Sequence, residues 1–154
     1  MAVPAQIAAL IGTWRGTNHL WLSPGEPVRK SESRAEITTV AQEQFADIRY
    51  TWADKGKPQE GRLIIGQETE HEIVRAVWLD SWHMMDKFMI CEGSIMAEGT
   101  VSVKGSYAAP PGPDWGWQID IEPQENDSFR FAMHNISPEG EKMLAVEVIY
   151  SRQD

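Results

Sequence analysis

The chain has 154 residues, of which 14 are Lys or Arg and 23 are Asp or Glu, so its net charge near neutral pH is −9. This length is enough for one sizeable core, and we expect a single domain over residues 1–154. The acidic balance argues against nucleic acid and anionic membrane surfaces as partners, and no stretch of the sequence approaches the length of a membrane span.

The first predicted elements are a short helical cap and a strand. Residues 4–10 suit one or two helical turns, with Pro4 near the first position and Gly12 ending the run. A strand is then expected over residues 13–22. After a Pro/Gly turn, a second strand is expected over residues 29–40. Its first half is entirely polar, so we expect it to project into solvent or to line a solvent-filled opening.

Alternation of apolar and polar side chains predicts the strands in the middle of the chain. Residues 45–53 place Ile48, Tyr50 and Trp52 on one face. Further strands are expected at 60–66, 72–80, 89–96 and 100–107. Residues 81–88 are ambiguous, because their apolar spacing suits a helix while the absence of a cap suits a distorted strand.

The last third of the chain gives the clearest strands. One face of residues 115–121 carries only Trp and Ile, and residues 129–134 repeat the alternation. The final strand, 142–152, is expected to share one face among Leu144, Val146, Val148 and Tyr150. About ten strands with regular turn signals predict an all-β fold, an antiparallel up-and-down β-barrel with a short N-terminal helical cap.

The opening Gly12-Thr13-Trp14-Arg15-Gly16 resembles the calycin superfamily of lipocalins, fatty-acid-binding proteins and nitrobindin-like barrels. In that superfamily an arginine of the last strand packs across the opening tryptophan and closes the barrel. The resemblance implies that Arg152 packs across Trp14 and closes the barrel. The alternative hypothesis is that Arg152 neutralises the carboxylate of a ligand. With Trp78-Leu79-Asp80-Ser81-Trp82 and Tyr150-Ser151-Arg152, the pattern is similar to a bacterial family of single-domain lipocalin-like proteins of unknown function.

A barrel of this size predicts a binding protein that holds a small apolar or amphipathic molecule inside. Aromatic and methionine side chains would supply the walls, and a few polar groups would orient the ligand. The candidate ligand-binding residues are Asn18, Tyr50, Trp52, Trp78, Asp80, Trp82, Met84, Trp117, Phe131 and Tyr150. The alternative is that the indoles simply fill the core and that Asp80 opens a turn with Ser81.

Three other hypotheses stay open. A small isomerase- or hydrolase-like enzyme would use Asp80 or His83 as acid or base, although no catalytic motif is present. A nitrobindin-like barrel would hold heme through a histidine, but no cofactor is predicted because the histidine contexts do not match. A homodimer would bury outward apolar residues such as Trp21. The four histidines show no metal-ligand spacing, so no metal site is expected.

The compartment is expected to be the cytoplasm. Residues 8–11 form an apolar run too short for a secretory signal, and no Lys or Arg precedes it. Cys91 is the single cysteine, which rules out a disulfide within the chain and fits a reducing environment.

Overall fold

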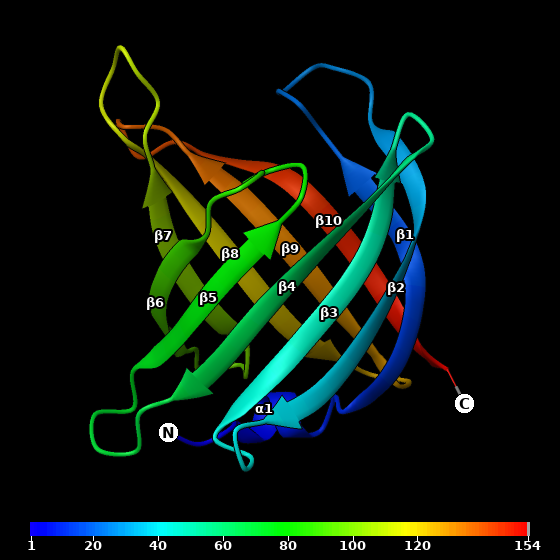
Figure 1. Ribbon diagram of the computed structural model, residues 1–154, viewed down its shortest axis with the longest axis vertical. Helices are drawn as coiled ribbons and strands as arrows, with labels where there is room; N and C mark the ends of the chain where they lie inside the picture. Colours follow the sequence, from blue (N-terminus) through cyan, green and yellow to red (C-terminus); the bar gives the residue numbers. More distant parts are fainter. Residues whose placement is uncertain (154) are drawn as a thin grey trace.

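The computed structural model describes residues 1–153, and they form a closed antiparallel β-barrel (Figure 1). Each strand pairs with the next along the chain, and the first strand pairs with the last. This confirms the predicted barrel. Within the described residues the elements are α1 (Ala5–Ala8), β1 (Gly12–Leu20), β2 (Arg29–Val40), β3 (Phe45–Asp54), β4 (Lys57–Gln67), β5 (Val74–Asp80), β6 (Met89–Ile95), β7 (Val101–Tyr107), β8 (Trp115–Gln124), β9 (Ser128–Ile136) and β10 (Lys142–Gln153).

Tight turns set the register between neighbouring strands. The β3–β4 hairpin turns on Lys55 and Gly56, which both have positive φ, at 50° and 79°. A two-residue turn of this kind matches the right-handed twist of the strands that it joins. The gap between the predicted strands 45–53 and 60–66 is therefore shorter in the structure, and Pro58 lies inside β4.

The barrel closes where β1 meets β10, with Trp14 opposite Arg152 in the register. The Arg152 guanidinium lies 4.4 Å from the centre of the Trp14 ring. It donates hydrogen bonds to the carbonyl oxygens of Ile11 (2.8 Å) and Ala9 (2.9 Å), and the Trp14 indole N–H donates to Leu10 (2.8 Å). Arg152 therefore ties the last strand both to the opening tryptophan and to the backbone that follows α1.

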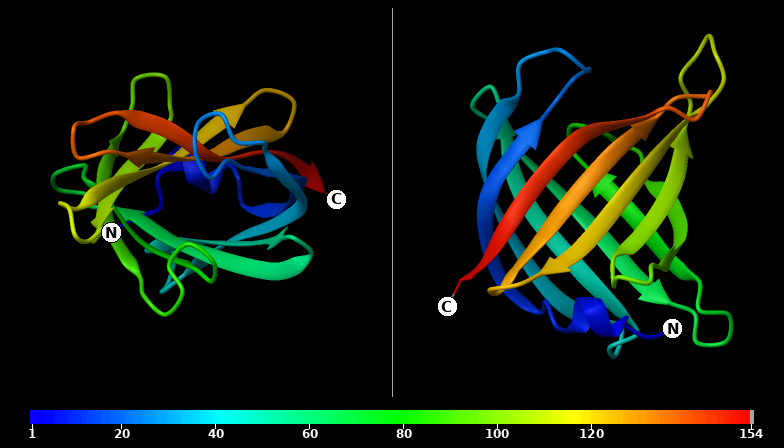
Figure 2. Two further views of the ribbon diagram at one scale, coloured as in Figure 1. Left: turned by 90° about the horizontal axis from the view of Figure 1, so that it is seen from above. Right: turned by 180° about the vertical axis from the view of Figure 1, so that it is seen from behind.

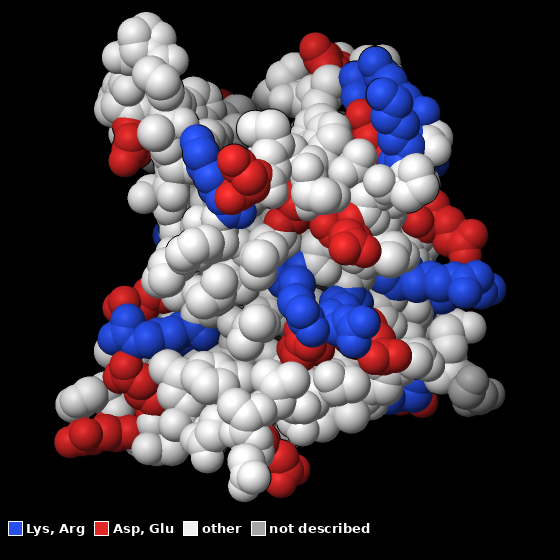
Figure 3. Space-filling model, in the orientation of Figure 1, with Lys and Arg blue, Asp and Glu red and all other residues white. Residues whose placement is uncertain are grey.

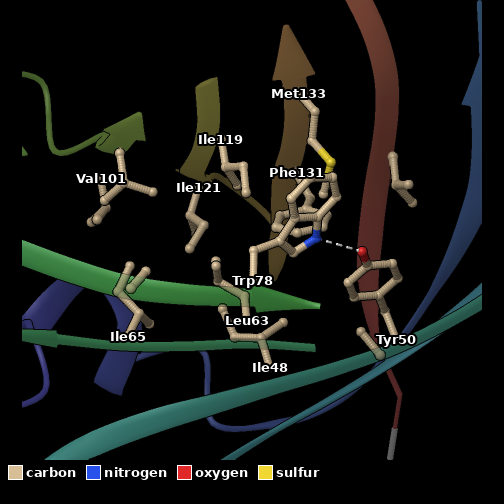
Figure 4. Close-up of a cluster of buried hydrophobic side chains, with 14 of the residues drawn as sticks. Ile48, Tyr50, Leu63, Ile65, Trp78, Val101, Ile119, Ile121, Phe131 and Met133 are labelled. Carbon is tan, nitrogen blue, oxygen red and sulfur yellow. Dashed lines mark hydrogen bonds between the residues drawn. The ribbon is translucent and has the colours of Figure 1, made fainter. Parts of the chain in front are cut away.

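The end of the barrel beside α1 is filled by side chains. Figure 2 shows α1 lying across this end. Ile7 of α1 has no exposed surface, and it belongs to one core cluster with large buried side chains of the strands, several of which Figure 4 shows. They include Ile37, Ile48, Leu63, Ile65, Ile119, Ile121 and Phe129. The core beneath α1 is therefore closely packed.

The helix α1 is only four residues long. None of the helices in residues 1–153 is long and apolar enough to span a lipid bilayer.

Candidate functional site: an aromatic cage at the end opposite the helix

Asp80, the last residue of β5, organises the end of the barrel opposite α1. Its side chain is buried, with the residue 2% exposed. One carboxylate oxygen accepts hydrogen bonds from the Tyr50 hydroxyl (2.7 Å) and the Trp52 indole N–H (3.3 Å). The other accepts from the backbone N–H groups of Trp82 and His83, both at 2.9 Å. Four donors on one carboxylate compensate the desolvation of its charge.

These hydrogen bonds explain the ambiguous segment 81–88, which is a turn and neither a regular helix nor a strand. The backbone N–H groups of Met84 and Met85 both donate to the Asp80 carbonyl oxygen, at 2.9 and 3.1 Å. The Asp80 carboxylate takes two further N–H groups, as an N-cap does. Met85 then has a positive φ of 55°, which stops the helical winding.

This turn places the His83 imidazole among four indoles. Its ring centre lies 5.6 Å from that of Trp52, 5.7 Å from Trp78, 4.7 Å from Trp82 and 5.3 Å from Trp117. Trp78 and Trp117 also stack on each other, with centres 5.3 Å apart and planes 10° apart. We call these five residues the aromatic cage. Burial lowers the pKa of His83, although the nearby Asp80 charge raises it in part, so the imidazole is neutral near pH 7.

One indole N–H of the aromatic cage is buried without a hydrogen-bond partner among the described residues. The Trp78 N–H donates to the Tyr50 hydroxyl (2.9 Å; Figure 4), and the Trp52 N–H reaches Asp80. The Trp117 N–H is buried and finds no acceptor in the part of the chain that the structure describes, while the residue as a whole is 6% exposed. A buried donor without an acceptor costs about 1–3 kcal/mol, and such donors are rare in folded proteins.

The remaining predicted residues lie at several places in the interior. Asn18 is buried on β1, and Met84 is partly buried against the core. Phe131 lies 5.4 Å from the Tyr50 ring, between ring centres. The Tyr150 hydroxyl is hydrogen-bonded to Ser33 at 2.6 Å. Sequence reasoning missed Ser33 because it lies in the polar first half of β2.

The structure also has a groove on the outer face of β1–β5, with a volume of about 850 Å³. Residues that are paired across adjacent strands form rows that run across the sheet. The backbone of one such row forms the floor of the groove, and the outward side chains of the rows on either side of it form the walls. Four arginines line it, namely Arg15, Arg34, Arg49 and Arg62. Each is paired with a carboxylate, so the charges on this face are interleaved (Figure 3). Alternation within each strand predicts outward-facing side chains of this kind, but none of these four arginines is among the candidate ligand-binding residues.

No group of three or more His, Cys, Asp or Glu side chains within residues 1–153 is arranged to hold a metal ion. His134 has a buried Nδ1 atom with no partner among the described residues. It lies on β9, which is outside the aromatic cage.

The model of the family described as "Protein of unknown function (DUF1579)" matches residues 4–152. The chain belongs to the DUF1579 family. Among solved structures, this DUF1579 chain is similar to Rv2717c from M. tuberculosis, at 14% sequence identity and a TM-score of 0.64, with 99% of each chain covered. None of the curated proteins matches the sequence. At this identity the structural likeness shows the fold alone, so the chemistry has to be argued from the residues of the chain.

Proposed function

We propose that this protein binds a small amphipathic molecule at the end of the barrel opposite α1. A hydrogen-bond acceptor on the ligand would meet the Trp117 indole N–H, and its apolar part would lie against the aromatic cage. The unpartnered, buried N–H of Trp117 carries this proposal, because a bound acceptor removes the cost of leaving that donor unsatisfied.

The chemistry of the cage supports a ligand of this class. Small-molecule sites are mostly apolar, with a few polar groups that fix the orientation. Four indoles give large apolar faces, and the neutral His83 imidazole can donate or accept one further hydrogen bond. The Gly12-x-Trp14 opening resembles that of the calycin barrels. Since calycin barrels enclose ligands, this resemblance fits the same interpretation.

The alternative of an enzyme that uses Asp80 as acid or base is less well supported. Both of its oxygens already accept hydrogen bonds from Tyr50, Trp52 and the backbone of the turn. A carboxylate held in this way is suited to anchoring the turn and the cage. We therefore assign Asp80 a positioning role in the proposed site.

We propose the cytoplasm as the compartment. Cys91 is a free, buried thiol, and burial raises its pKa to about 11. It is therefore protonated and poorly reactive, as expected of a structural cysteine in a reducing environment.

The first test is native mass spectrometry of freshly purified protein, followed by titration of delipidated protein with dodecanoate. Trp117→Phe keeps an aromatic ring and removes the N–H, and loss of one hydrogen bond is expected to weaken dodecanoate binding by about tenfold. Trp115→Phe is the matched control, since Trp115 lies on the same strand outside the aromatic cage. The proposal is wrong if the wild type binds no dodecanoate and carries no co-purified mass, or if both variants bind as the wild type does.

A further inference from the structure

The barrel wall has a seam between β6 and β7. The register joins them from Glu92 opposite Lys104 to Ile95 opposite Val101. Residues 89–91 pair with β5 on their other side, and residues 105–107 pair with β8. Within the described residues, no ladder pair joins 89–91 to 105–107. This stretch, which we call the seam, therefore lacks the ladder pairing that ties the neighbouring strands together.

A side chain fills the seam from inside. A Cβ atom on Gly105 would lie 2.5 Å from the Met89 sulfur and 3.0 Å from the Ile90 carbonyl oxygen, so the Met89 thioether occupies the space that a larger residue would take. Methionine is unbranched and adapts its shape easily. Gly105 is paired with Trp117 on β8. Moving the Met89 side chain would therefore open the wall next to the unpartnered indole.

Several exposed apolar side chains lie on the β5–β6 side of the seam, next to the exposed Asp86 and Lys87. Met85, Phe88 and Ile90 are 73%, 62% and 64% exposed, and Leu79 is 40% exposed. These four, which we call the entrance patch, make up half of the eight large apolar side chains that are exposed in residues 1–153. They lie on the end of β5, the following turn and the start of β6. Clustered exposed apolar side chains usually mark a binding surface, whereas single ones need no explanation.

We infer that a single-chain amphiphile reaches the aromatic cage through the seam, and that the part of its apolar tail beyond the cage lies against the entrance patch. This inference rests on the proposed function and adds the ligand class, a hydrogen-bond-accepting head group such as a carboxylate on an alkyl chain. The occupant of the patch is the tail of the same ligand, because Ile90 of the patch lies on the β6 edge of the seam and Gly105 on the β7 edge is paired with Trp117. Met89 is then a gate that the ligand displaces.

The gate is tested with a fluorescent fatty acid, 11-(dansylamino)undecanoic acid, mixed with delipidated protein in a stopped-flow instrument. Met89→Ala removes the side chain that fills the seam, so the association rate is expected to rise severalfold. Met89→Leu is the matched control, because it keeps the seam filled and is expected to leave the rate close to that of the wild type.

The position of the tail is tested with a label on the surface, in two variants that share the same background. Ile90→Cys is labelled with an environment-sensitive dye in a Cys91→Ser background, and Ile149→Cys on β10 is labelled as the control. Adding dodecanoate is expected to shift the emission of the dye at residue 90 to shorter wavelength and to leave the dye at residue 149 unchanged.

The outcomes separate the two proposals. If the wild type binds the dansyl probe but Met89→Ala leaves the rate unchanged and the label at residue 90 does not respond, the seam is not the entrance and the proposed function stands. If the label at residue 90 shifts with protein concentration in the absence of ligand, the patch is an interface between copies of the chain and the inference is wrong. If the wild type binds no amphiphile, both proposals fail.

Discussion

Asp80→Ala is the substitution that most directly tests how the aromatic cage is held. It leaves the Tyr50 hydroxyl and the Trp52 N–H without their acceptor inside the barrel, and it removes the cap from the N–H groups of the turn. An unsatisfied buried donor costs about 1–3 kcal/mol, and the lost cap costs about 1 kcal/mol. Because the Trp52 bond is long, at 3.3 Å, its share is at the low end.

Removing a buried charge also removes its desolvation penalty, which offsets part of that loss. We therefore expect Asp80→Ala to lower the free energy of unfolding by about 3 kcal/mol, against a total of roughly 5–15 kcal/mol for a domain of this size. Equilibrium unfolding in urea, followed by tryptophan fluorescence, measures it. Asp86→Ala, an exposed aspartate in the same turn, is the control and should change stability by less than about 0.5 kcal/mol. A loss below about 1 kcal/mol for Asp80→Ala would show that the carboxylate is not the anchor that these hydrogen bonds indicate.

Three further predictions concern closure, pH and packing. Arg152→Ala removes the stacked guanidinium and two hydrogen bonds to the backbone, and should lower the free energy of unfolding in urea by about 2 kcal/mol; an unchanged midpoint would contradict its closing role. Because burial lowers the pKa of His83 in the folded protein, the unfolded chain binds more protons, so the free energy of unfolding should fall as the pH drops below about 6.5. His83→Gln should flatten this slope in urea unfolding at several pH values, while exposed His71→Gln should not. Gly16→Ala should lower the melting temperature in calorimetry, because its Cβ would lie 2.5 Å from a backbone oxygen of β10, whereas Gly112→Ala, whose Cβ would come no closer than 3.8 Å to a backbone oxygen, should leave it unchanged.

The fold could be predicted from the sequence because alternation is a local property of a strand. Trp115 to Ile121 alternates without a break, and the structure pairs these residues with β7 in one continuous register. The last strand shows the limit of the pattern. A bulge shifts the register between Leu144 and Val146, so that Leu144 is paired with His134 and Val146 with Met133. Leu144 therefore does not share a face with Val146, contrary to the prediction. An extra residue in a ladder leaves no mark in the apolar pattern of a single strand.

The candidate site was predictable only in part, because it depends on contacts between distant segments. The unusual cluster Trp78-Leu79-Asp80-Ser81-Trp82 pointed to the end of β5, and the structure brings Tyr50 and Trp52 to the same carboxylate. The enclosure of His83 by four indoles and the missing acceptor of Trp117 depend on the register of β8 against β7 and on the shape of the turn. No local pattern encodes either of them.

The measurement that tests the central claim most directly is a two-dimensional ¹H–¹⁵N spectrum of the indole N–H groups, recorded while dodecanoate is added. Trp117→Phe assigns the resonance of Trp117, since its peak is the one that disappears. We predict that this peak moves downfield as its N–H gains an acceptor, while that of Trp14, already hydrogen-bonded at the other end of the barrel, stays in place. A Trp117 peak that does not respond while dodecanoate binds elsewhere would contradict the proposed site.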